Sequence, residues 1–282
     1  MGKALRAKAI AVASLLSLAL GAAASAATIG NCELTGKKGE FSAKAAVPGQ
    51  LTVEVNLPAP GWWNGDTPEA IKDGFEYCMA ANVANRLGLD RVQVVNVGWD
   101  ALVAGETKGY DLALSQASIT DERKKVVDFS VPYFSSDIGM LVKKGMAVNE
   151  KSIKGMRIGV QQGTTGADFV ADKLKPATPA KVFQDTPTMF TALAAGQIDV
   201  AMTDTAIVLG QSAESKGAFV VPGQYNTGET YGAIYPKGSA NGATFDKVIE
   251  ALKKDGTLNK LSAKYLAAAW GKDPTKIPYF KP

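Results

Sequence analysis

The sequence of 282 residues contains no histidine and only two cysteines, Cys32 and Cys78. Without histidine, a Ser-His-Asp triad, a Cys-His catalytic pair and a histidine-ligated metal are all excluded. Two thiols are also too few for a four-cysteine zinc site. Acid–base chemistry by carboxylates or lysines is all that remains open to an enzyme. We expect no metal site, no catalytic residues and no enzyme activity.

Signals for nucleotides and nucleic acids are also missing. Residues 159–165, Gly-Val-Gln-Gln-Gly-Thr-Thr, resemble a phosphate-binding loop but lack its lysine before Ser/Thr. There is no basic tract and no interleaving of aromatic with basic residues. We therefore expect no cofactor and no nucleic-acid partner.

Long apolar runs are absent as well. The run at residues 10–20 is shorter than the ~20 residues that a bilayer span requires, which argues against a retained membrane anchor. It follows three basic residues among the first eight and precedes an A-x-A motif at residues 24–26. This pattern predicts a cleavable signal peptide of residues 1–26 and export to the periplasm.

Cleavage of this segment would leave 256 residues and would remove three basic residues and no acid, so the net charge falls from +4 to +1. The basic character of the chain therefore belongs partly to its export signal. A chain of this length fits one large or two modest domains, and we expect a monomer.

The two cysteines form an even count in an exported chain, which favours a disulfide. Such a bridge would contribute about 4 kcal/mol by constraining the unfolded chain. The alternative is two unpaired thiols, with Cys78 at the buried edge of a helix. In both cases the pair is structural.

Strand and helix patterns alternate along the chain. β-rich runs predict strands at 51–55, 92–97, 111–114, 157–160 and 199–202. Apolar periodicity predicts helices at 75–87, 99–103, 167–174, 189–195 and 245–252. This alternation predicts an α/β fold with mainly parallel sheets flanked by helices, after a polar leader segment at 27–44.

The most specific pattern lies between residues 109 and 133. Its elements are Gly109-Tyr110-Asp111, Thr120-Asp121-Glu122-Arg123 and Asp128-Phe129-Ser130-Val131-Pro132-Tyr133. In this order they resemble the signature of polar amino-acid-binding proteins, the family 3 solute-binding proteins of ABC importers. The resemblance extends over about residues 45–270. It implies capture of a free amino acid and its delivery to the membrane subunits of an ABC importer.

The resemblance also implies a two-lobed periplasmic-binding-protein fold with two hinge strands. Residues 136–143 resemble the first hinge strand and residues 231–237 the second. Lobe 1 would then comprise residues 45–138 plus 234–282, and lobe 2 residues 139–233. In such a fold, a ligand between the lobes favours hinge closure.

A buried amino acid needs partners for both its carboxylate and its ammonium group. Arg123 can bind a carboxylate with two parallel hydrogen bonds, which is its role in the resembling proteins, where the hydroxyl and amide at the Ser118 position assist. There the Gln116 position gives a backbone carbonyl to the ammonium. The alternative for Arg123 is a solvated arginine paired with Asp121 or Glu122.

Lobe 2 would complete the ligand site. Asp204 follows a predicted strand at the end where α/β clefts open, and is the candidate partner of the ammonium, with a helix N-cap as the alternative. The resemblance places Thr164 and Thr165, before a predicted helix, against the ligand carboxylate; a plain helix cap is the alternative. Gln161 would contact the ligand side chain.

Specificity is expected from lobe 1. In the resembling family, an acid near the Asn56 position accompanies cationic ligands. The neutral Asn56 therefore favours a polar or neutral ligand. Glu54 is close enough to this position to keep a cationic ligand as an alternative. We expect an aromatic wall from Trp62, ahead of Trp63, with loop packing as the alternative for both. Trp99 is a further candidate.

The main alternative function is an enzyme on the same fold. Some relatives of these binding proteins are dehydratases that act on small carboxylated rings and use carboxylates of the cleft as acid–base groups. Glu54 or Asp204 would then serve this role, and turnover of a cyclohexadienyl acid would distinguish the two functions.

Overall fold

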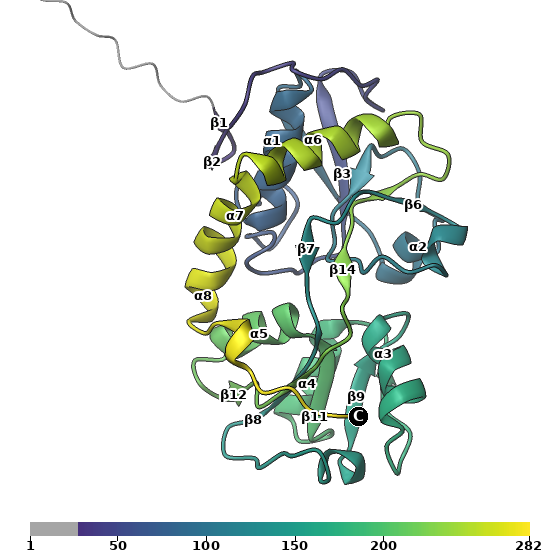
Figure 1. Ribbon diagram of the computed structural model, residues 1–282, viewed down its shortest axis with the longest axis vertical. Coiled ribbons are helices and arrows are strands. Elements are labelled where there is room, and N and C mark those ends of the chain that lie inside the picture. The colour runs from purple at the N-terminus through teal and green to yellow at the C-terminus, as the bar shows by residue number, and fades with distance from the viewer. Residues whose placement is uncertain (1–27) are drawn as a thin grey trace, which may run out of the picture.

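A computed structural model of the chain describes residues 28–282, so the predicted signal peptide lies outside the described residues. The chain forms two α/β lobes, which lie one above the other in Figure 1 and are joined by strands near the centre. Among the described residues, no helix combines the length and apolar character needed to cross a bilayer.

Lobe 1 is built on a five-stranded sheet with the order β4-β3-β5-β15-β6. Its strands are β3 (Gln50–Val55), β4 (Arg91–Asn96), β5 (Leu112–Ala113), β6 (Asp128–Phe129) and β15 (Ile234–Tyr235). The helices of this lobe are α1 (Phe75–Arg86), α2 (Trp99–Val103), α6 (Gly242–Lys254) and α7 (Thr257–Ser262). A π-helical stretch, Ala263–Ala267, continues α7 into α8 (Ala268–Trp270), which packs against α5 (Thr205–Glu214) of lobe 2. Every residue of β3 is buried, because the sheet is covered on both sides of this strand.

Lobe 2 contains a second sheet with the order β10-β9-β11-β8-β12, in which β13 also pairs with β8. Its strands are β8 (Ile138–Lys143), β9 (Ile158–Gln161), β10 (Lys181–Phe183), β11 (Val200–Asp204), β12 (Phe219–Val220) and β13 (Gln224–Tyr225). The helical elements are a short turn at Ile153–Gly155, α3 (Thr165–Phe169) with its continuation Val170–Leu174, α4 (Thr186–Ala194) and α5 (Thr205–Glu214).

The predicted α/β class is confirmed, but both sheets are mixed rather than mainly parallel. In lobe 1, β3 is parallel to β4 and β5, whereas β15 is antiparallel to β5 and β6. In lobe 2, β9 is parallel to β10 and β11, whereas β8 is antiparallel to β11. The antiparallel strands β15 and β8 enter directly from the hinge, and no crossover helix sets their direction.

The predicted elements lie close to their expected positions. The helix expected at 99–103 is α2 with the same bounds, and the helix expected at 75–87 is α1. The helix expected at 189–195 begins earlier, at Thr186, because the Asp185 side chain accepts a hydrogen bond from the Thr188 amide (2.7 Å) and caps the helix.

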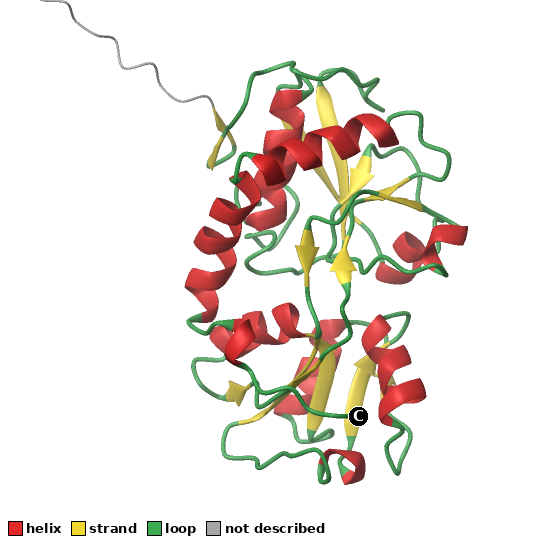
Figure 2. Cartoon of the chain, viewed as in Figure 1, coloured by secondary structure: helices red, strands yellow, loops and turns green. Residues whose placement is uncertain are grey.

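The lobes are connected through a two-stranded antiparallel sheet of β7 (Phe134–Ser135) and β14 (Thr230–Tyr231), visible between the lobes in Figure 2. The crossing is thus shorter than the hinge strands expected at 136–143 and 231–237. The residues that follow it belong to β8 in lobe 2 and to β15 in lobe 1.

Residues 271–282, which we call the C-terminal strap, leave α8 and return to lobe 2, where the chain ends (Figure 1). They include a short turn at Pro274–Lys276. The Gln224 amide donates to the Pro278 carbonyl (2.9 Å), and the Phe280 amide donates to the Gln224 carbonyl (2.8 Å). Through these bonds the strap pairs with the backbone of β13 in lobe 2.

The leader packs on lobe 1 through a hairpin of β1 (Thr28–Ile29) and β2 (Cys32–Glu33). The expected disulfide between Cys32 and Cys78 is confirmed, and it joins this hairpin to α1. Nearby, the Thr35 amide donates to the Asn82 side chain (2.7 Å), so the leader is attached to α1 at more than one point.

Candidate functional site

A cleft of about 1270 Å³ lies between the lobes and is lined by residues of both. All ten residues predicted to bind the ligand line it: Asn56, Trp62, Trp99, Gln116, Ser118, Arg123, Gln161, Thr164, Thr165 and Asp204. Glu54 is not among the lining residues and is 3% exposed. The structure therefore brings the predicted set together but leaves Glu54 out.

Arg123 lies in a helical turn, Arg123–Lys125, with its guanidinium pointing into the site. Its Nη1 donates to the Ser118 carbonyl (2.8 Å) in lobe 1, and its Nη2 donates to the Gly163 carbonyl (3.0 Å) in lobe 2. The guanidinium also lies over the Trp99 ring, 5.1 Å from its centroid. Two of the five guanidinium N–H groups are used in these bonds, which leaves three for an anionic ligand group.

The alternative of a solvated Arg123 does not occur. The neighbouring acids Asp121 and Glu122 pair instead with Lys124 and Lys125. Burial lowers the pKa of Arg123. Nearby negative charges oppose this decrease, and Asp204 has the largest effect among them.

Asp204 ends β11 on the opposite lobe and is buried. It occupies the position before α5, but its side chain makes no cap hydrogen bond. Instead it accepts hydrogen bonds from the Tyr231 hydroxyl (2.8 Å) and the Thr203 hydroxyl (3.2 Å). Burial, followed by the negative charge of Glu229, raises the pKa of Asp204 to about 6.

The two threonines before α3 have different roles. The Thr164 hydroxyl accepts from the Ala167 amide (3.2 Å) and donates to the Gln161 carbonyl (2.7 Å), so its side chain is a helix cap. The Thr165 hydroxyl is not part of this cap. It donates to the Glu229 carboxylate (2.6 Å) on the second hinge segment.

Glu229 was not predicted from the sequence as a site residue. Its Oε2 also accepts a hydrogen bond from the Ser118 hydroxyl (2.7 Å), so one carboxylate oxygen joins residues of both lobes. Glu229 and Tyr231 alternate along the chain at the second hinge, and alternate residues of a strand face the same side. This spacing is the signal that could have identified both residues.

Gln116 adopts a left-handed backbone conformation with φ of 49°, which is uncommon for a residue other than glycine. The buried Glu76 carboxylate holds this turn by accepting from the Gln116 amide (3.0 Å) and side chain. Trp63 Nε1 (2.7 Å) and the Tyr133 hydroxyl donate to the same carboxylate. Burial raises the pKa of Glu76, and these hydrogen bonds oppose the increase.

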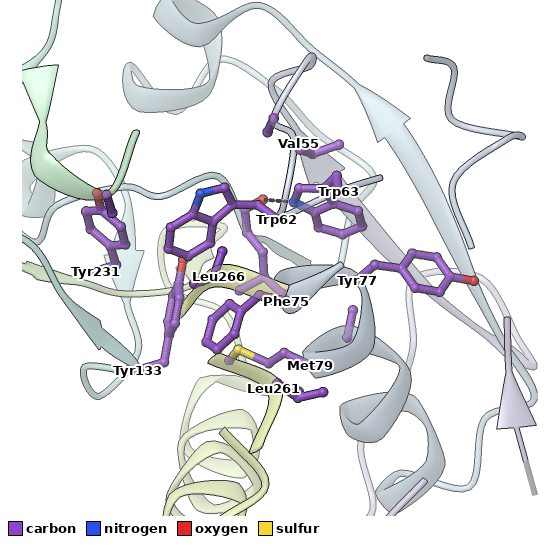
Figure 3. Close-up of a cluster of buried hydrophobic side chains, with 14 of the residues drawn as sticks. Val55, Trp62, Trp63, Phe75, Tyr77, Met79, Tyr133, Tyr231, Leu261 and Leu266 are labelled. Atoms are coloured by element: carbon purple, nitrogen blue, oxygen red, sulfur yellow. Dashed lines mark hydrogen bonds between the residues drawn. The ribbon is translucent and has the colours of Figure 1, made fainter. Parts of the chain in front are cut away.

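The tryptophans that line the cleft differ in burial. Trp62 is 2% exposed and packs edge-on against Phe75 (5.3 Å between ring centroids), Phe134 (5.0 Å) and Tyr231 (5.7 Å), as Figure 3 illustrates for the labelled rings. It therefore has little surface to offer a ligand. Trp99 is only half-buried, and its Nε1 donates to the Gly163 carbonyl (3.2 Å) of the other lobe.

Asn56 and Gln161 line the cleft with their amide groups already bonded to protein. Asn56 donates from Nδ2 to the Val97 carbonyl (2.9 Å). Gln161 accepts from the Thr186 hydroxyl and donates to the Gln184 carbonyl (3.4 Å).

The charge of the cleft is unbalanced. Five of its lining residues are acids, namely Asp66, Asp100, Asp185, Asp204 and Glu214, whereas Arg123 is its one cationic residue. Such a lining repels an acidic ligand side chain. No group of three or more histidine, cysteine or carboxylate side chains within residues 28–282 is placed to hold a metal ion.

The chain is similar to known solute-binding proteins. Residues 67–268 match the bacterial extracellular solute-binding proteins, family 3. The chain is 32% identical to the L-cystine-binding protein of Escherichia coli K12 over 201 residues, which cover 69% of this chain and 74% of that protein. It is 30% identical to a probable histidine-binding protein of Neisseria gonorrhoeae over 263 residues, which cover 90% and 96% of the two chains.

Among solved structures, an ancestral amino acid-binding protein described as a precursor of cyclohexadienyl dehydratase is similar, with a TM-score of 0.67 and 28% identity. The match covers 77% of this chain and 95% of that one.

Proposed function

The chain belongs to the bacterial extracellular solute-binding proteins, family 3, and from this membership we propose that Arg123 and Asp204 hold a free amino acid between the lobes. Its relatives are amino-acid-binding proteins of ABC importers, and it functions as one of this class.

One observation carries the residue assignment. Arg123 and Asp204 are buried groups of opposite charge that line the same cleft from different lobes. A zwitterionic amino acid supplies the complementary pair, so that its carboxylate meets the guanidinium and its ammonium meets the carboxylate. Ser118, Thr165, Gln116 and the remaining predicted residues would surround this pair.

We propose a ligand with a neutral or polar side chain. The acidic lining of the cleft supports this by disfavouring aspartate and glutamate, and it leaves cationic side chains possible. Of the aromatic candidates, the half-buried Trp99 is better placed than Trp62 to contact the ligand.

A thermal-shift screen of the refolded protein, freed of any co-purified ligand, tests the function. The panel should include glutamine, histidine, cystine and arginine, with aspartate and several dicarboxylates as acidic comparisons. We expect a rise in Tm with at least one non-acidic amino acid. If no amino acid raises the Tm, the proposed function is wrong.

We propose that the protein returns its ligand unchanged. An enzyme on this fold would need an acid–base group in the cleft, and Asp204, with its pKa raised to about 6, is the one member of the expected pair that lines it. Incubation with a cyclohexadienyl acid, followed by chromatography, should recover the compound intact. Conversion at a rate abolished by Asp204→Asn would instead establish the dehydratase alternative.

We further propose a periplasmic monomer that delivers its ligand to the membrane subunits of an ABC importer. Export by residues 1–26 predicts that the mature protein from the periplasmic fraction begins at Ala27. N-terminal sequencing and light scattering after size-exclusion chromatography test these two points.

A further inference from the structure

The Glu229 carboxylate lies where the two lobes and the hinge meet. Its Oε2 accepts a hydrogen bond from Ser118 Oγ (2.7 Å) in lobe 1 and another from Thr165 Oγ1 (2.6 Å) in lobe 2. Both hydroxyls line the cleft, whereas Glu229 lies behind them, beside a smaller cavity of about 290 Å³ at the back of the hinge. Glu229 is therefore not part of the surface that a ligand would cover.

The backbone of the hinge fixes the place of this carboxylate. The Ser136 amide donates to the Glu229 carbonyl (3.2 Å), and the Ile119 amide donates to the Thr230 carbonyl (2.9 Å). Ser118 and Tyr231 form a β-bridge, so the chain on either side of Ser118 runs directly beside the second hinge segment. The contact to Ser118 is thus anchored in lobe 1, and it does not depend on the position of lobe 2.

The contact to Thr165 does depend on the position of lobe 2. Thr165 begins α3, and the Arg123 and Trp99 side chains of lobe 1 bond to Gly163 only two residues before it. Hydrogen bonds to an ionised carboxylate are shorter and stronger than bonds between neutral groups. We call the arrangement in which these bonds join the two lobes the closed arrangement. Because movement of lobe 2 away from the hinge would break the bond between Thr165 and Glu229, this bond favours the closed arrangement.

A hydroxyl has a single proton, and both of these hydroxyls donate theirs to Glu229. The carboxylate therefore also sets the direction in which the two hydroxyl oxygens face the cleft. Without the carboxylate, each hydroxyl would be free to rotate. Ligand binding would then have to restrict this rotation, at a cost in conformational entropy.

We propose that Glu229 is a positioning residue for ligand binding, which couples the closed arrangement of the lobes to the orientation of Ser118 and Thr165. The effect on affinity rests on the proposed function, whereas the effect on closure does not. A ligand that requires the closed cleft binds more tightly when that arrangement is already populated.

The first test compares Glu229→Ala with Glu250→Ala. Glu250 is exposed on α6, and its side chain has no hydrogen-bond partner within the part of the chain that the structure describes, so its removal is a matched control. Spin labels at the exposed positions Glu106 in lobe 1 and Lys173 in lobe 2 would report the distance between the lobes in ligand-free protein.

We expect Glu229→Ala to shift this distance distribution to larger values and to weaken binding of the best amino acid from the screen by about tenfold, which corresponds to one hydrogen bond to a charged group. Glu250→Ala should match the wild type in both measurements. Equal distributions and equal affinities for the two variants would overturn the proposal.

The second test is a double-mutant cycle on binding affinity with Glu229→Ala and Thr165→Ala. If the carboxylate acts partly through Thr165, the loss of affinity in the double variant should be smaller than the sum of the losses in the two single variants. Fully additive losses would show that Glu229 and Thr165 act independently and would contradict the coupling.

If Glu229→Ala does not fold, Glu229→Gln replaces it in the distance measurement. Its side-chain oxygen can still accept both hydrogen bonds but carries no charge, so we expect a smaller shift in the same direction. A glutamine variant with the wild-type distribution would count against the proposal. If the wild type binds no amino acid, the proposed function fails, but the ligand-free distances still decide whether Glu229 couples the lobes.

Discussion

At the scale of single residues, recognition depends on Arg123 and Asp204, which are buried with opposite charges on different lobes. Each already has protein partners: Arg123 donates to two backbone carbonyls, and Asp204 accepts from the Tyr231 hydroxyl. These bonds fix the directions of both charged groups before a ligand arrives, which reduces the ordering that binding requires.

Replacing Arg123 tests whether its guanidinium binds the carboxylate of the ligand. Arg123→Ala should weaken amino-acid binding by about 100-fold or more, since truncation of a buried charge pair costs 2–5 kcal/mol. The ligand-induced rise in Tm should disappear, while the circular dichroism spectrum of the ligand-free protein stays unchanged. Wild-type affinity in this variant would remove Arg123 from the site.

Asp204 should make binding of the ligand's ammonium group depend on pH. Its folded-state pKa of about 6 lies above the ordinary value of 3.8, so the ligand-free fold binds an extra proton between these values and loses stability as the pH rises through them. A ligand ammonium prefers the ionised carboxylate, so affinity should fall below pH 6, by up to about tenfold per pH unit.

Titration calorimetry from pH 4.5 to 8 measures this dependence. Asp204→Asn should bind the amino acid weakly and show a flatter pH profile, whereas its affinity for the deaminated analogue should change little. Equal losses for the amino acid and the deaminated analogue would make Asp204 a structural residue.

At the scale of elements, two side chains that line the cleft also hold the elements of the fold together. Trp62 packs among Phe75, Phe134 and Tyr231 and thereby joins α1 to both hinge strands. Figure 3 shows Trp62 with Phe75 and Tyr231. Thr164 caps α3. An aromatic or hydroxyl side chain near a cleft thus has two possible uses, and its burial and hydrogen-bond partners decide between them.

The disulfide is an element-scale feature with a testable effect. Replacing Cys32 and Cys78 together by serine should lower the free energy of unfolding by up to about 4 kcal/mol, because the bridge restricts the unfolded chain. Chemical denaturation measures this change. Ligand affinity should not change, since neither cysteine lines the cleft; a large loss of affinity would connect the leader to the site.

At the scale of the whole molecule, the two hinge strands and the C-terminal strap connect the lobes within residues 28–282. Asp137 joins all three, because its Oδ1 accepts from the Thr227 amide (2.9 Å) and its Oδ2 accepts from the Tyr279 hydroxyl (2.7 Å). Phe280 of the strap packs on Tyr225 of lobe 2, with 6.2 Å between the ring centroids.

Removal of residues 278–282 should therefore destabilise lobe 2. Loss of the half-buried Phe280 ring and of the backbone pairing with Gln224 should lower the free energy of unfolding by about 2 kcal/mol. Chemical unfolding of the truncated protein, with deletion of Pro282 alone as the control, tests this. Equal stability of the two proteins would mean that the strap contributes nothing to the fold.

The sequence by itself determined the alternation of strands and helices and ten of the residues that line the cleft, and it favoured the pairing of the two cysteines. These features can be predicted because each depends on residues that are close together in the sequence, as in the signature around Arg123. The direction of a strand depends instead on how the chain enters the sheet, and the sheets are mixed because the hinge leads the chain into β8 and β15 antiparallel to their neighbours.

Only the tertiary structure identified Glu229. It lies 111 residues from Ser118 and 64 from Thr165, yet one of its carboxylate oxygens bonds to both. The burial of Trp62 and the return of the strap to lobe 2 were likewise decided by packing between distant segments. Sequence patterns report the periodicity of one segment, whereas these contacts depend on how separate segments meet in space.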